Sequence, residues 1–320
     1  MSDTTALTGT EQIQFKGGLK KESFWRYFRM HTWLYILLVP GVVYLFIFNY
    51  IPIYGIIIAF KDFSIVRGII DSPWAGLSHF RDLFGSEHFY RVFRNSLTIS
   101  LLRLFWGFPV PIFLAILLNE TKHVTFKRVV QTIIYVPHFI SWVVVIGIVV
   151  NFLSIDGLFN HLITSVGGEA RNFLIEPAWF RPILISAEIF KQAGWGTIIY
   201  LAAISGIDDQ LYEAAIVDGA NRFQRIIHIT LPGIVSTIVV LLILRLGRIL
   251  DNGFEQIFLL YNSLTRDVAD VFETYAYRTG LQEGRFAFST AVNMFKSIVG
   301  LVMILTTNHL ARRLRETALW

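Results

Sequence analysis

The feature that most constrains this chain is a series of apolar runs, each close to the length that crosses a bilayer. A helix rises about 1.5 Å per residue and the hydrocarbon core is about 30 Å thick, so a span needs about 20 apolar residues. The runs predict an all-α membrane protein with six transmembrane helices. The expected spans are residues 32–60, 92–118, 131–153, 182–204, 233–250 and 286–310.

Composition decides between a membrane protein and a soluble one. The 320 residues are 54% hydrophobic and only 16% charged, whereas soluble domains carry about 25% charged residues. The absence of cysteine excludes disulfides and thiolate metal sites. The eight histidines show no metal-ligand spacing, and a net charge of +5 is no reason to expect nucleic acid.

Orientation is indicated by lysine and arginine, which are enriched in the cytoplasmic segments of membrane proteins. They are dense in segment 1–31, in the short loop before the third span and in segment 311–320, and sparse in the longer loops between. We therefore expect cytoplasmic N- and C-terminal tails on either side of a transmembrane domain at 32–310.

A polar stretch at 207–232, IDDQLYEAAIVDGANRFQRIIHITLP, separates the fourth and fifth spans. Asp208 and Asp209 are good N-cap residues, because a carboxylate accepts the free amides of a first helical turn. Gly219 can adopt the left-handed conformation that ends a helix. A second short helix is expected after it, closed by Pro232. The stretch predicts a helix, a glycine turn and a second helix on the cytoplasmic side.

This polar stretch resembles the EAA loop of permease subunits from binding-protein-dependent ABC importers. The family pattern is E-A-A, three residues, G, nine residues, then I-x-L-P. The chain matches it at seven fixed positions, namely Glu213, Ala214, Ala215, Gly219, Ile229, Leu231 and Pro232. The alternative is an ordinary interhelical loop that matches by chance.

The resemblance implies a type I importer permease fold in a bacterial inner membrane. It further implies a second permease subunit, two ABC ATPase subunits that bind ATP and Mg²⁺, and an extracytoplasmic solute-binding protein. Whether the second permease is a homologue or another copy of this chain stays open. The chain itself lacks the glycine loop G-x-x-x-x-G-K-[ST], so we expect it to hydrolyse no ATP and to bind no cofactor.

In the family, the first helix of this loop docks in a groove of the ATPase. The residues expected to form that coupling surface are Leu211, Glu213, Ala214, Ala215, Asp218 and Gly219. The alanines let another backbone approach closely, Glu213 offers a charge, and Leu211 offers apolar burial. The alternative is that the alanines pack against the chain's own spans.

Ionisable residues near the middle of the spans are the second informative feature. Such groups are costly in a membrane unless they face a bundle interior or a wet cavity. They form a candidate substrate cavity of Arg103, Glu188, Lys191, Arg245, Arg248 and Lys296. Five cations beside one carboxylate favour an anionic solute. The alternative is that the cations snorkel or pair with Asp251 and a partner subunit.

The segments around the polar stretch look like the sugar-importer branch, and most like permeases of the lipoprotein, alginate and uronide kind. The resemblance therefore implies an oligosaccharide substrate, and the cations favour an acidic one, although Asp251 and Glu255 weaken that step. A neutral oligosaccharide or another small solute is the alternative. An ion-coupled secondary transporter would need paired intramembrane acids, and a membrane enzyme would need a catalytic pair; the sequence shows neither.

Overall fold

The computed structural model describes residues 29–313, so the tails expected at 1–31 and 311–320 lie almost wholly outside the described residues. The described chain is helical, with no strand beyond an isolated bridge between Lys61 and Trp74. The all-α expectation is confirmed for these residues. Contacts divide the chain into two units, one ending at Gly55 and one beginning at Ile56.

The first unit is a single helical run of α2 (Thr32–Leu45), η1 (Phe46–Tyr50) and α3 (Ile51–Ile53). It is apolar around its whole circumference, and none of its residues is buried. A helix that is hydrophobic all round belongs in lipid or against another chain. This run carries most of the span expected at residues 32–60.

The second unit holds the remaining helices, apart from the first two residues of η2, which belong to the first unit. Their bounds are α4 (Gly68–Asp71), α5 (Ser78–Gly85), α6 (Glu87–Leu102), η3 (Arg103–Gly107), α7 (Pro109–Glu120), α8 (Val124–Phe139), α9 (Trp142–Leu153), α10 (Leu158–Ser165), α11 (Pro177–Ile204), α12 (Asp209–Val217), α13 (Arg222–Arg225), η4 (Ile226–Thr230), α14 (Leu231–Gly247), α15 (Phe254–Leu260), α16 (Arg266–Ala269), α17 (Phe272–Tyr277), η5 (Arg278–Gln282) and α18 (Phe286–Arg313), preceded by η2 (Tyr54–Phe60).

Five helical runs are long and apolar enough to cross a membrane among the residues described. They are Thr32–Phe60, Glu87–Glu120, Trp142–Ser165, Arg222–Gly247 and Phe286–Arg312. The span expected at 182–204 lies on α11, whose 28 residues extend about 42 Å. This helix is less apolar because it carries Glu188 and Lys191 in its middle. The count of six spans stays a prediction.

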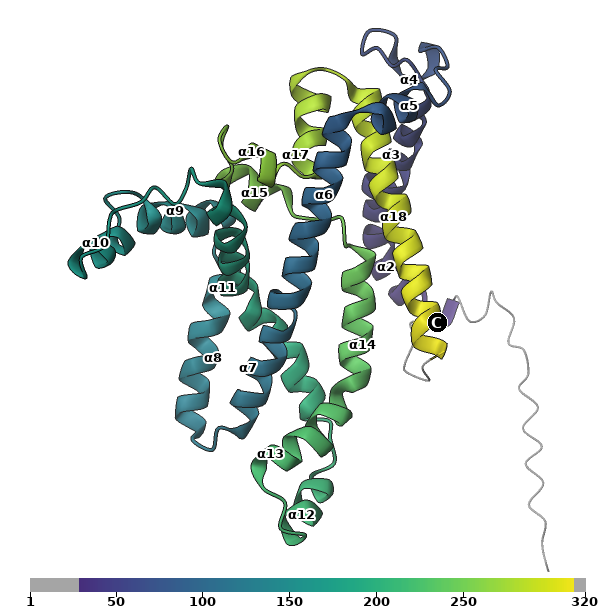
Figure 1. The fold of residues 1–320 in the computed structure, drawn as a ribbon. Helices are drawn as coiled ribbons and strands as arrows, with labels where there is room; N and C mark the ends of the chain where they lie inside the picture. The colour runs from purple at the N-terminus through teal and green to yellow at the C-terminus, as the bar shows by residue number, and fades with distance from the viewer. Residues whose placement is uncertain (1–28, 314–320) are drawn as a thin grey trace, which may run out of the picture. The chain divides into compact units, whose positions relative to one another are not determined.

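The third expected span, 131–153, is not one helix. It is divided between α8 and α9, with a break at Ile140 and Ser141. Pro137 lies in the last turn of α8, and the Ser141 hydroxyl accepts the amide of Val144 at 3.4 Å as the N-cap of α9. Proline weakens a helix and serine begins one, which explains the break. In Figure 1, α9 and α10 run to the side of α8.

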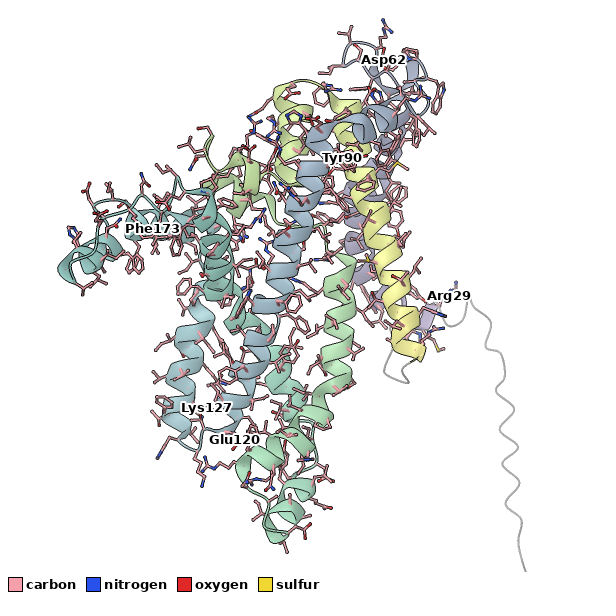
Figure 2. All side chains as sticks on the ribbon, in the orientation of Figure 1. Arg29, Asp62, Tyr90, Glu120, Lys127 and Phe173 are labelled. Atoms are coloured by element: carbon pink, nitrogen blue, oxygen red, sulfur yellow. The ribbon has the colours of Figure 1, made fainter. Side chains whose placement is uncertain are left out.

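The two ends of the second unit differ in character. Figure 1 shows α12 and α13 at one end and α16 and α17 at the other. Figure 2 places Glu120 and Lys127, on either side of the basic turn between α7 and α8, toward the α12 end, while Tyr90 lies toward the opposite end. This arrangement agrees with the orientation expected from the basic residues, in which the short loop and the polar stretch share one side of the membrane.

The core between the helices lies mainly near the end that carries α17. There Phe89, Phe272 and Phe288 are buried with residues of α5, α6 and α18. A smaller cluster, with Tyr200, Ile204 and Ile234 buried, joins α7, α11 and α14 just before the polar stretch. The helices on both sides of the polar stretch are therefore packed against each other and form a firm base for it.

Candidate functional site

The polar stretch begins as its capping residues predict. The Asp208 carboxylate accepts the amide of Gln210 at 2.9 Å and caps α12. After α12 ends, Gly219 has a φ of 80°, a conformation that L side chains rarely adopt. Asn221 and Gln224 then form a reciprocal capping box, with amide to side-chain distances of 2.8 and 2.9 Å. Both helices of the stretch start at side-chain caps, so their ends are well defined.

The expectation that Pro232 closes a separate second helix is wrong. The helix from Arg222 runs through the π-helical segment η4 into α14 without interruption, and Pro232 lies in the first turn of α14. A proline inside a regular α-helix clashes with the carbonyl four residues earlier. The wider turn of η4, directly before the proline, accommodates it. A movement of α13 is therefore carried straight into α14.

The α12 helix presents its side chains outward. None of its residues is buried, and Leu211, Ile216 and Val217 are more than half exposed. Ala214 is exposed, and Ala215 is half-buried. Among the described residues, Glu213 makes no ion pair. An exposed helix with apolar side chains and a free carboxylate has the character of a surface that another chain covers.

One side chain ties α12 to the membrane helices. The Tyr212 hydroxyl lies 2.9 Å from Oγ1 of Thr230, which is buried at the end of η4. This hydrogen bond connects α12 to the residue that directly precedes α14.

At mid-span, a carboxylate on α11 joins three helical segments. Glu188 forms an ion pair with Nε of Arg103, which begins η3, and a second one with Nη2 of Arg245 on α14 at 3.0 Å. The Arg103 side chain is only 7% exposed and that of Glu188 13%, whereas Arg245 is 44% exposed. The carboxylate of Glu188 is therefore paired with one buried arginine and with one partly exposed arginine.

Two cavities meet at this ion pair. One, of about 380 Å³, is lined by Arg103, Trp142, Arg248 and Asp251. The other, of about 250 Å³, is lined by Phe108, Trp195, Tyr200 and Leu241. Glu188, Gln192 and Arg245 line both. The lining of the first continues past the end of α14 to Gly253 and Gln256, and that of the second runs along α11 toward the polar stretch.

Lys191 and Lys296 are engaged outside these linings. Lys191 is buried, and its Nζ donates to the carbonyl oxygens of His138, at 2.6 Å, and of Ile140. The carbonyl oxygen of Pro137 lies 3.4 Å from the same nitrogen. Lys191 thus satisfies carbonyls exposed by the break after α8. Lys296 pairs with Glu273 at 2.7 Å and with Asp251 at 3.8 Å.

The excess of five cations over one carboxylate is therefore smaller in the fold than the sequence indicates. Asp251 was expected only as an alternative partner, and Glu273, which belongs to α17 between the fifth and sixth expected spans, was not foreseen. Arg248, in contrast, makes no ion pair with any residue from 29 to 313 and is exposed. Together with Arg245, it leaves positive charge on the wall of the larger cavity.

Aromatic side chains form part of the wall of the smaller cavity. The indole of Trp195 stacks on the ring of His138 with centroids 4.4 Å apart and planes at 7°. His138 in turn contacts Gln192 at 3.0 Å through Nδ1. Trp195 is 45% exposed beside the smaller cavity. A flat aromatic face next to hydrogen-bonding groups suits a sugar ring.

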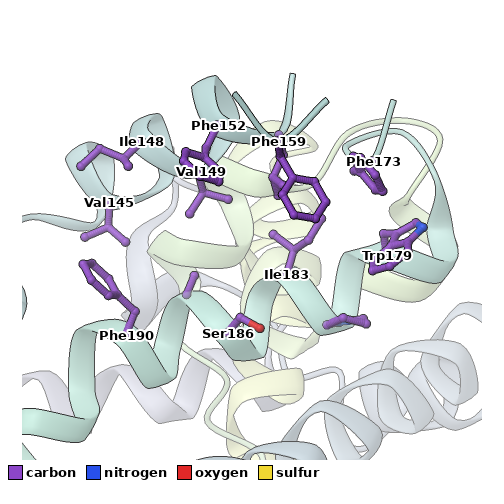
Figure 3. A pocket seen from close by; sticks show the side chains of 13 residues that line it. Val145, Ile148, Val149, Phe152, Phe159, Phe173, Trp179, Ile183, Ser186 and Phe190 are labelled. Atoms are coloured by element: carbon purple, nitrogen blue, oxygen red, sulfur yellow. The ribbon is translucent and has the colours of Figure 1, made fainter. Parts of the chain in front are cut away.

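An apolar pocket of about 470 Å³ lies apart from the charges, between α9, α10 and α11. Figure 3 shows Val145, Phe152, Trp179, Ile183 and Phe190 around it. Apart from Ser186 and the indole nitrogen of Trp179, its lining side chains are hydrocarbon. It offers little to a charged or sugar-like solute, and we assign it no part in the candidate site.

The end opposite the polar stretch carries a polar pocket of about 450 Å³. Asp270 accepts two hydrogen bonds from Arg278, at 2.6 and 3.3 Å, and both side chains are largely buried. Burial lowers the pKa of Arg278, but the hydrogen bond and charge of Asp270 raise it, and the net result is a raised pKa. Burial raises the pKa of the neighbouring Tyr275. This ion pair fastens α16 to η5.

Comparison with known proteins gives one family. The model described as "Binding-protein-dependent transport system inner membrane component" matches residues 107–316. Protein LplB of Bacillus subtilis (strain 168) is 46% identical over 319 residues, which are 99% of this chain and 98% of that protein. The polygalacturonan/rhamnogalacturonan transport system permease protein YteP of the same organism is 49% identical over 289 residues, 90% of either chain.

Solved structures agree with these relatives. A chain of a bacterial ABC transporter involved in the import of the acidic polysaccharide alginate is 47% identical. It superposes with a TM-score of 0.84 and covers 91% of this chain and 99% of that one. A second structure, of a bacterial alginate ABC transporter in complex with an alginate pentasaccharide-bound periplasmic protein, gives a TM-score of 0.85 at 46% identity, covering 93% of this chain and 100% of that one.

Proposed function

The chain belongs to the family of inner membrane components of binding-protein-dependent transport systems, and from this we propose that it is one permease subunit of an ATP-driven importer of acidic oligosaccharides. Membership confirms the importer permease fold expected from the EAA loop. We further propose that both termini face the cytoplasm, and that the chain works with a second permease, two ATPase subunits and an extracytoplasmic solute-binding protein.

The coupling role is supported by the exposure of α12. We propose that Leu211, Glu213, Ala214, Ala215, Asp218 and Gly219 form the surface that fits a groove of a partner ATPase, which binds ATP and Mg²⁺. The uninterrupted helix from α13 into α14, and the hydrogen bond from Tyr212 to Thr230, connect that surface to the membrane helices. When the ATPases close, α12 moves with them and shifts α14 against α11.

The single observation that carries the substrate class is the pair of adjoining cavities with Arg245 and Arg248 exposed on the wall. An uncompensated guanidinium favours a carboxylate ligand. The relatives named above belong to transport systems for polygalacturonan and alginate. Every uronate residue of these polymers carries one carboxylate, so their fragments present many such ligands. The aromatic face of Trp195 provides a platform for the sugar ring beside the same wall.

Transport by alternating access follows from these parts. The loaded binding protein docks at the end that carries α16 and α17, ATP closes the ATPases, and the cavity opens toward the docked protein. Hydrolysis then returns the helices to the arrangement open to the cytoplasm. The chain has no catalytic residues of its own in this scheme.

Reconstitution tests the proposal. The complete assembly in proteoliposomes should take up alginate pentasaccharide only with ATP and the loaded binding protein, and the sugar should stimulate ATP hydrolysis. A neutral pentasaccharide of the same length, made by reducing the carboxyl groups, should be taken up less. Uptake by the permeases alone, driven by an ion gradient, would refute the proposal. Equal uptake of the two sugars would refute the acidic substrate and leave an oligosaccharide importer.

A further inference from the structure

We propose that the ion pair between Glu188 and Arg245 is a charge gate between the two cavities, and that the carboxylate of an acidic sugar opens it by taking the place of Glu188 on Arg245. The inference rests on the proposed function and adds how an acidic substrate is told from a neutral one. Four arguments carry it, three from the structure and one from the chemistry of the sugar.

The first is position. Glu188 and Arg245 line both cavities, and the bond between them joins α11 to α14 at 3.0 Å. The larger cavity continues toward the residues that follow α14, and the smaller one toward the polar stretch. The bond therefore lies where the linings of the two cavities meet. The two helices that it joins are also the two that flank the coupling helix α12.

The second is the unequal hold on Glu188. The buried Arg103 forms an ion pair with one carboxylate oxygen of Glu188, and the more exposed Arg245 forms an ion pair with the other. Releasing a buried carboxylate from its only partner leaves an uncompensated charge, which is strongly unfavourable. Here Arg103 keeps Glu188 paired after Arg245 leaves. The contact with Arg245 can therefore be exchanged without stranding the carboxylate.

The third is a second arginine in the larger cavity, where the solute would enter. Arg248 lies at the C-cap of α14, three residues after Arg245, and lines the larger cavity without an ion pair of its own among the described residues. A uronate carboxylate can meet Arg248 first and then Arg245. An arginine fork binds a carboxylate through two parallel hydrogen bonds, whereas Glu188 uses one nitrogen of Arg245.

The fourth is what a neutral sugar cannot do. Hydroxyl groups carry no charge to replace Glu188, so opening the gate for a neutral sugar separates Arg245 from its carboxylate with no ionic replacement. An interaction that rejects a solute by leaving a charge unpaired is an effective source of specificity. The gate thus passes acidic sugars by exchange and resists neutral ones, in addition to any preference of the binding protein.

The test uses Arg245→Gln, which removes the exposed arginine and leaves the buried pair of Arg103 with Glu188. In the full assembly, alginate pentasaccharide should stimulate ATP hydrolysis more than its carboxyl-reduced counterpart, when each sugar is supplied at a concentration that saturates the binding protein so that unequal loading does not decide the result. In Arg245→Gln that preference should fall at least about tenfold, the effect of one lost ionic contact of about 1.4 kcal/mol. Arg94→Gln, an exposed arginine outside both cavities, should keep the preference.

A second measurement reports the gate itself. The chain contains no cysteine, so a single Ile199→Cys in the smaller cavity reports entry of a membrane-impermeant thiol reagent from the outer side. We expect labelling with alginate pentasaccharide and ATP, little labelling with the neutral analogue, and labelling independent of the sugar once Arg245→Gln is added. Equal labelling with both sugars in the parent variant, or an unchanged preference in Arg245→Gln, overturns the gate. Absence of any sugar-stimulated hydrolysis in the native assembly instead overturns the proposed function.

Discussion

The ammonium nitrogen of Lys191 lies 2.6 Å from the carbonyl oxygen of His138, so a lysine of α11 caps the end of α8. Carbonyls at a helix end have no partner within their own helix, and at membrane depth no bulk water replaces one. The ammonium group donates in the same way to the carbonyl of Ile140, and it lies 3.4 Å from the carbonyl of Pro137, which already accepts the amide of Ile140 at 3.2 Å. The same nitrogen lies 5.5 Å from the ring centre of Trp142, at the start of α9.

Lys191→Met should therefore destabilise the permease, because it removes the lysine donor from the carbonyls of His138 and Ile140. We expect a loss of about 1–3 kcal/mol, the usual cost of an unsatisfied buried polar group. Thermal unfolding of the purified assembly in detergent should show a lower midpoint. Lys191→Arg keeps several donors and should lose less. If Lys191→Met has the same unfolding midpoint as the unsubstituted assembly, the capping role is wrong.

Gly194→Ala tests the close approach of α8 to α11. A Cβ at Gly194 would lie 1.8 Å from the carbonyl oxygen of Ile134, so the two helices must separate. We expect a loss of at least about 1–3 kcal/mol from overpacking. Gly147→Ala is the matched control, because its Cβ would meet nothing within 4 Å; it should be neutral or stabilising by about 0.5–1 kcal/mol. Equal unfolding midpoints for the two variants would contradict the close approach.

Glu213→Lys and Gly219→Pro should uncouple ATP hydrolysis from uptake while leaving membrane insertion intact. Glu213 is exposed on α12, so its reversal alters a contact surface and not the core. Gly219 has a φ of 80°, whereas proline requires about −65°, so the turn after α12 must change. Uptake and hydrolysis are measured together in proteoliposomes. Glu169→Lys, an exposed residue in the loop after α10, is the charge-matched control; native coupling in both test variants would disprove the assignment.

Arg278→Gln should destabilise the end that carries α16 and α17, since it leaves the Asp270 carboxylate buried with Thr274 as its one remaining side-chain donor among residues 29–313. Removing one partner of a buried ion pair costs about 3–5 kcal/mol. The double variant Asp270→Leu with Arg278→Met should be less destabilised, because no charge is left alone. Denaturant or thermal unfolding of all three variants checks the order. A double variant that is as unstable as the sum of its parts would argue against the pair.

The same pair predicts a lack of pH dependence on the alkaline side. A raised pKa in the folded state contributes stability that is present below the unfolded pKa and is lost only as the pH rises through the folded value. The hydrogen bond and charge of Asp270 raise the pKa of Arg278 above its ordinary value. We therefore expect the contribution of this arginine to unfolding stability to be constant between about pH 6 and about pH 9. A decline that disappears in Arg278→Gln would contradict this.

Local signals were strong enough to predict the polar stretch from sequence. Asp208 caps α12 and Gly219 makes the turn, because capping and positive φ depend on residues that are neighbours in the chain. Pro232 was misinterpreted for the opposite reason. Whether a proline ends a helix or is accommodated depends on the turn before it, and the π-helical widening of η4 has no sequence signal that we recognised.

Pairing between distant residues could not be predicted in the same way. Glu188 and Arg245 are 57 positions apart, and Lys296 and Glu273 lie on different helices of a region that had been divided into loop and span. Sequence analysis counted charges at a common depth and obtained a large positive excess. The fold neutralises part of it and leaves Arg245 and Arg248 exposed.

Sequence alone determined that this chain is a helical membrane protein of the importer permease family with a polar stretch that matches the EAA pattern, because hydrophobic length and a motif of fixed spacing are properties of consecutive residues. Tertiary structure alone decided which charged residues form ion pairs with one another, where the third expected span breaks, and which arginines line a cavity. Those outcomes depend on the packing of helices that are far apart in sequence, and the energy of an ion in a membrane depends on what lies across from it.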